Sequence, residues 1–132
     1  MSETQNTTTA EVEVNDGMEI YHQNYNLDQK DNLDQIPEEA GIFGVFSLVR
    51  DTPSNCRIVK SSENLRQSVR LLFENAEDTG VRKFMQGPWI KYLKYQSLDS
   101  ENEQIDELFN QWTEQFEPKV DEEGEYPGYY EY

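Results

Sequence analysis

The chain has little cysteine, histidine or positive charge. Among its 132 residues, Cys56 is the single cysteine and His22 the single histidine, and 11 Lys and Arg face 27 Asp and Glu, for a formal charge of −16. A lone cysteine has no partner for an internal disulfide. One cysteine and one histidine also cannot supply a structural zinc site or a Cys/His catalytic pair. We therefore expect no metal site and no cofactor.

Long apolar runs are missing as well. No stretch of the sequence approaches the roughly 18 apolar residues that identify a membrane-spanning helix. Residues 1–10 hold no basic region followed by an apolar run, which a secretory signal requires. These two absences predict a cytoplasmic protein with no membrane segment.

The negative charge belongs to the two ends of the chain. Counted along the sequence, residues 1–40 carry a net charge of −9, residues 41–98 carry +4 and residues 99–132 carry −11. Net charge governs solubility and the choice of partner rather than the fold. Acidic ends make binding of nucleic acid by the whole chain unfavourable and favour a protein partner, in particular a basic one.

Composition predicts that one part of the chain folds and another does not. Only 35% of the residues are hydrophobic, as in disordered proteins, yet 12% are aromatic, which disordered proteins are not. We expect an acidic, largely disordered leader at 1–35, one folded domain at 36–120 and an acidic, tyrosine-rich tail at 121–132.

Hydrophobic patterns within 36–120 predict an α+β domain with a three-stranded sheet and flanking helices. Residues 41–50 and 56–60 are apolar and β-branched, and the turn residues at 51–55 make them a hairpin. A third strand is expected over 89–97. Helices are expected after Ser61-Ser62, over about 81–86, and from a capping box at 100–103 to Pro118. One core is expected, formed by Phe43, Leu65, Val69, Phe73, Leu108 and Trp112.

Four short stretches carry a resemblance to a known family. They are IPEEAGIF at 36–43, CRIVK at 56–60, SENL at 62–65 with Val69 and Phe73 after it, and EPKVD at 117–121. In this order, the stretches and the elements around them resemble the GIY-YIG nuclease superfamily, which includes homing endonucleases and the N-terminal domain of a bacterial excision-repair subunit. The resemblance covers about 36–121 and implies a small GIY-YIG-like domain.

The same resemblance implies that catalysis is lost. Nucleases of this family use tyrosine, arginine and a metal-binding glutamate to cleave a phosphodiester bond. The family's functional positions fall here on residues that cannot take these roles: Phe43, Ile58, Lys60, Ser68, Leu72, Phe109 and Asp121. We therefore expect a protein that is not an enzyme, in which Phe43, Ile58, Leu72 and Phe109 add to the core.

Three functions remain open at this point. The first is a non-catalytic protein-interaction module, an accessory or regulatory subunit of a larger complex. The second is an acidic nucleic-acid mimic that inhibits a DNA- or RNA-binding protein, and the third is a residual nucleic-acid-binding domain. The third would use a basic patch of Arg82, Lys83, Lys91 and Lys94, interleaved with aromatic residues.

The tail supplies a second candidate site. It interleaves acids with tyrosines, which give contact area at a low cost in conformational entropy. The candidate partner-binding residues are Tyr126, Tyr129, Tyr130 and Tyr132. Their acceptor is either a partner or the chain's own 82–94 region.

Overall fold

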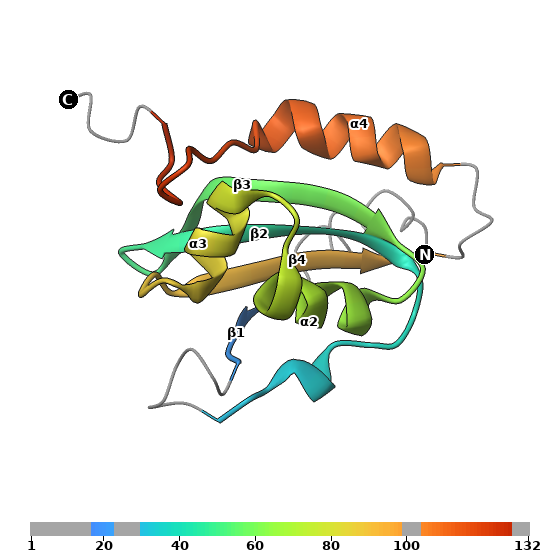
Figure 1. Cartoon of the computed structure of the whole chain (residues 1–132). Helices are drawn as coiled ribbons and strands as arrows, with labels where there is room; N and C mark the ends of the chain where they lie inside the picture. The colour runs from blue at the N-terminus through green and yellow to red at the C-terminus, as the bar shows by residue number, and fades with distance from the viewer. Residues whose placement is uncertain (1–16, 23–29, 99–103, 128–132) are drawn as a thin grey trace.

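The computed structural model describes residues 17–22, 30–98 and 104–127. It shows one antiparallel sheet of four strands in the order β1-β4-β2-β3, with helices on both faces (Figure 1). The elements in chain order are β1 (Gly17–Ile20), the 3₁₀ helix η1 (Leu33–Gln35), β2 (Gly41–Val49), β3 (Thr52–Ser62), α2 (Leu65–Asn75), α3 (Thr79–Gln86), β4 (Lys91–Ser97) and α4 (Ile105–Phe116).

The expectation of three strands was wrong, because the leader contributes a fourth. β1 pairs antiparallel with β4, from Gly17 opposite Lys94 to Ile20 opposite Lys91. Ile20 and Leu33, both ahead of the expected domain boundary at 36, are buried in the core. A four-residue strand gives a weak pattern in the sequence, and its pairing depends on a partner more than 70 residues away.

The β2–β3 hairpin has a tighter turn than expected. The two strands are joined by Arg50 and Asp51 alone, and both adopt positive φ angles of 54° and 66°. Two successive residues with positive φ form the turn whose twist matches that of paired strands. Residues 52–55 therefore belong to β3, and of the expected loop at 51–55 only Asp51 lies in the turn.

Two helices cover one face of the sheet. α2 begins two or three residues later than Ser61-Ser62 suggests, because the N-cap is Asn64, whose side chain accepts the hydrogen bond from Gln67 N at 3.1 Å. α3 begins at Asp78, whose carboxylate accepts from Val81 N at 3.0 Å. The side chains of this face form the larger core cluster, which includes Phe43, Leu65, Val69, Phe73 and Phe84.

The opposite face is covered by α4, so the expectation of a single core was wrong. Trp112 is buried there with Ile42, Phe46, Cys56 and Val59, and Leu108 and Phe116 pack beside it. Residues 108, 112 and 116 form one stripe along the helix, whereas Phe109 lies about 100° away and is 36% exposed. Phe109 is therefore not part of the core, contrary to expectation, while Phe43 and Leu72 are buried and Ile58 packs against the core.

After α4, the C-terminal strap (residues 117–127) crosses edge strand β3 and reaches α3. Lys119 N donates to Cys56 O of β3 at 3.1 Å, and Lys83 of α3 pairs with Glu123 at 3.5 Å. Gly124 has φ +88°, and a Cβ there would lie 2.8 Å from Phe84 N. The strap has no helix or strand, but it is packed against the domain rather than separate from it.

Candidate functional site

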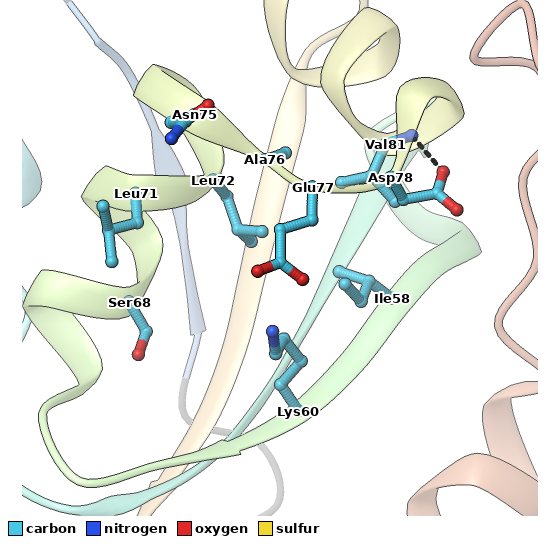
Figure 2. A pocket seen from close by; sticks show the side chains of 10 residues that line it. All are labelled: Ile58, Lys60, Ser68, Leu71, Leu72, Asn75, Ala76, Glu77, Asp78 and Val81. Carbon is cyan, nitrogen blue, oxygen red and sulfur yellow. Dashed lines mark hydrogen bonds between the residues drawn. The ribbon is translucent and has the colours of Figure 1, made fainter.

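A pocket lies between β3, α2 and α3. Its volume is about 320 Å³. Figure 2 shows the side chains that line it, with Ile58 and Lys60 coming from β3, Ser68, Leu71 and Leu72 from α2, and Glu77 and Asp78 from the α2–α3 connection. Leu71 is 50% exposed, which is unusual for a large apolar side chain at a pocket.

Four of the positions that the family resemblance singled out meet at this pocket. Ile58, Lys60, Ser68 and Leu72 all line it. The other three lie elsewhere: Phe43 is fully buried in the core, Phe109 is on the far face of the sheet, and Asp121 is in the strap. The pocket thus combines an apolar floor with a small number of polar groups.

Two of the polar groups of the pocket are engaged in local contacts, and two point into it. Ser68 Oγ is 2.6 Å from Ser62 Oγ, and the Asp78 carboxylate caps α3. The Lys60 ammonium and the Glu77 carboxylate both point into the pocket (Figure 2). Within the described ranges, no three His, Cys, Asp or Glu side chains gather in a way that could hold a metal ion. The pocket can accept apolar side chains and pair with charges of either sign.

The structure does not gather the predicted basic patch on one surface. Lys91 is buried against Phe84, whereas Lys94 lies over Phe46 and Phe116 on the α4 face. The two lysines are three residues apart on β4, so they point to opposite faces of the sheet. Arg82 Nε donates to Ala76 O, and Lys83 pairs with Glu123 of the strap.

Of the four tyrosines of the candidate partner-binding set, the structure describes one. The Tyr126 ring lies 5.2 Å from Lys119 Nζ and 5.8 Å from the guanidinium carbon of Arg57. Tyr129, Tyr130 and Tyr132 lie outside the described residues. Both of these Tyr126 contacts lie within the chain, and neither Lys119 nor Arg57 belongs to the 82–94 region that was named as one of two possible acceptors.

The burial of two cations was not predicted from the sequence: Arg57 was not singled out, and Lys91 was assigned to the basic patch. Arg57 is 4% exposed and Lys91 is 6% exposed. Burial lowers the pKa of Arg57, while Glu125 and Asp121 of the strap act to raise it. Burial and the Arg57 charge lower the pKa of Lys91 to about 8. The one available sequence signal for the burial of Arg57 was its position next to the apolar residues of the stretch CRIVK.

Comparison with family models, with curated proteins and with solved structures gives no match for this chain. In the part of the chain that is described, no helix combines the length and the apolar character needed to cross a membrane. The fold and the pocket geometry are therefore the basis for a functional proposal.

Proposed function

We propose that this chain is a non-catalytic protein-interaction module, an accessory or regulatory subunit, and that the pocket between β3, α2 and α3 receives its partner. The observation that carries the proposal is the composition of the pocket. Its lining includes the apolar residues Ile58, Leu72 and Val81 and the exposed Leu71. The charged residues Lys60 and Glu77 line it as well. An apolar centre with a charged rim is the usual anatomy of a protein interface.

The GIY-YIG resemblance supports the same proposal. In a nuclease of that family, the corresponding positions would carry the tyrosine hydroxyl and the arginine that catalysis needs. Here Ile58, Ser68 and Leu72 cannot activate water or stabilise a phosphate. A scaffold without these catalytic groups can still function by binding a partner through its surface. The proposed module is a degenerate GIY-YIG-like domain.

A capture experiment with two matched variants tests the proposal. Binding proteins are captured from a cell lysate of the source organism at low and at high salt. The baits are the tagged full-length protein and its variants Leu71→Glu and Ile90→Glu. Leu71 and Ile90 are 50% and 49% exposed, and Ile90 does not line the pocket. We expect a partner that binds at both salt concentrations, is lost with Leu71→Glu and is kept with Ile90→Glu.

The alternatives give different results. An acidic nucleic-acid mimic would capture basic proteins at low salt only, because charge attraction between exposed groups is screened by salt, and it would be insensitive to Leu71→Glu. Capture that both variants retain equally, or that both lose, would contradict the proposed site.

A further inference from the structure

Arg57 is placed by two irregularities in the β2–β3 pairing. The register shifts on both sides of Phe46, which leaves Asn55 and Arg57 of β3 with no residue opposite them on β2. Simple alternation would send neighbours Arg57 and Ile58 to opposite faces. The bulge brings both to the face that α3 covers, as bulges do when they redirect a side chain.

The Arg57 guanidinium is enclosed by aromatic rings. Its central carbon lies 4.4 Å from the centre of the Phe84 ring and 5.8 Å from those of Trp89 and Tyr126. Aromatic faces attract the cation, but they do not accept its in-plane N–H groups in ordinary hydrogen bonds. Nε and Nη1 are buried and have no hydrogen-bond partner among the residues that the structure describes. Such orphaned donors are rare in folded proteins and need an explanation.

A second cation makes the local charge more positive. Lys91 Nζ lies 5.4 Å from the same Phe84 ring and donates to Gly87 O at 2.9 Å and Trp89 O at 2.7 Å. The ion pairs found among residues 17–22, 30–98 and 104–127 include neither Arg57 nor Lys91. Because burying unpaired charge is costly, this environment favours the entry of an anion.

A cavity beside Arg57 has room for a small anion. This cavity of about 80 Å³ is lined by Arg57 together with Ser47, Asn55, Trp89 and Glu125. It is much smaller than the roughly 300–1,000 Å³ pockets that hold drug-sized ligands. The space suits a single small group rather than a nucleotide base or a helix.

We propose that Arg57 is the centre of an oxyanion-binding site, which takes one carboxylate or phosphate group and for which Glu125 of the strap is an internal competitor. Both groups offer oxygen acceptors for guanidinium N–H groups, and guanidinium groups bind both. The Glu125 carboxylate lines the same cavity, and its negative charge opposes an entering anion. This site is separate from the pocket assigned to the protein partner, so either can fail without the other.

The test uses the full chain, with inorganic phosphate and acetate as the probes. Thermal unfolding and titration calorimetry at pH 7 compare each salt with chloride at constant ionic strength. Binding to the folded state alone raises the melting temperature. We expect phosphate, acetate or both to raise it, and the more effective salt identifies whether phosphate or carboxylate chemistry is preferred.

Four variants separate a specific site from general salt effects. Arg57→Met, which fills the space without orphaned donors, is expected to fold and to lose binding. Arg57→Lys, which keeps the charge, is expected to bind more weakly. Glu125→Gln is expected to bind about tenfold more tightly, as loss of an opposing charge nearby implies. Lys30→Met, which removes an exposed cation ahead of η1 and away from the strap, is the control and is expected to bind as wild type does.

The opposite results would overturn the proposal. Equal responses of wild type and both Arg57 variants would mean a general effect of salt. No binding to wild type and none to Glu125→Gln would exclude the site. A Glu125→Gln variant that melts earlier and binds no more tightly would show that Glu125 is the permanent partner of Arg57. Binding seen only with Glu125→Gln would support a site that the strap carboxylate normally closes.

Discussion

Replacing Trp112 by alanine is the strongest test of the two-sided architecture. Trp112 is 2% exposed and lies at the centre of the cluster that joins α4 to the sheet. Its ring meets Phe116 edge-on, with 5.5 Å between ring centres. Loss of a buried tryptophan side chain leaves a cavity and costs about 3–5 kcal/mol. That is a large part of the roughly 5–15 kcal/mol that stabilises an ordinary domain.

Urea unfolding followed by far-ultraviolet circular dichroism measures this effect without relying on tryptophan fluorescence. With a slope of about 1–3 kcal/mol per molar urea, a loss of this size lowers the midpoint by about 1 M or more. Phe109→Ala on the same helix is the matched control. Since Phe109 is 36% exposed, its replacement is expected to change the stability by about 0.5 kcal/mol or less. Equal midpoints for Trp112→Ala and wild type would refute the burial argument.

A double variant then asks whether the two clusters are independent. Val69 belongs to the cluster beneath α2 and Trp112 to the cluster beneath α4, with the sheet between them. Residues without shared partners have additive effects within about 0.3–0.5 kcal/mol. We expect the losses in the free energy of unfolding caused by Val69→Ala and Trp112→Ala to be additive in the double variant. A coupling energy of about 1 kcal/mol or more would favour the single core that the sequence predicts.

Four further predictions concern chemistry and the strap. Purified protein is expected not to cleave DNA or RNA with Mg²⁺ or Mn²⁺; cleavage that tracked with mutations in this domain would contradict the degenerate interpretation. Because the pKa of Lys91 falls from 10.5 to about 8, the folded state loses this proton first and gains stability as pH rises between these values. The stability of wild type relative to Lys91→Met, from urea titrations, should therefore rise over pH 8–10.5, and a constant difference would contradict this. Burial raises the pKa of Cys56 to about 12, so a thiol reagent at pH 8 should label it only after unfolding; rapid labelling of folded protein would refute its burial. Gly124→Ala is expected to speed protease cleavage of the strap, because φ +88° and contact with Phe84 oppose a side chain; unchanged cleavage would mean that the strap does not depend on this contact.

The sequence predicts local structure well where its signal is local. The stripe of Leu65, Val69, Leu72 and Phe73 identifies α2, and all four are buried. Strand β1 and the two-residue turn at Arg50 were missed for a different reason. Strand pairing depends on residues that are distant in the sequence. The positive φ of Arg50 could not be predicted, because arginine seldom adopts this conformation. The helix at α4 was predicted, but Phe109 was wrongly assigned to the core, and only the topology decides which face of the sheet this helix covers.

The pocket and the buried cations show the same division. The family resemblance named Ile58, Lys60, Ser68 and Leu72, and the structure places all four around one pocket. Nothing in the sequence indicates the irregular pairing that turns Arg57 toward Phe84. Periodicity assigns alternate residues to alternate faces, so it fails at a bulge, where one added residue changes the face of its neighbours.

The strap changes how the acidic tail is understood. The glycines and the proline of the tail disfavour both helix and strand. From sequence alone, this composition indicates a segment with no fold of its own. The same lack of side chain lets Gly124 approach the α3 backbone, and on α3 Gly80 leaves room for Asp121 O. Close approach brings Glu123 to Lys83 and Glu125 to the cavity beside Arg57. Part of the tail's negative charge therefore acts on cations of its own domain, the exposed Lys83 and the buried Arg57, and only the remainder is available to attract a partner.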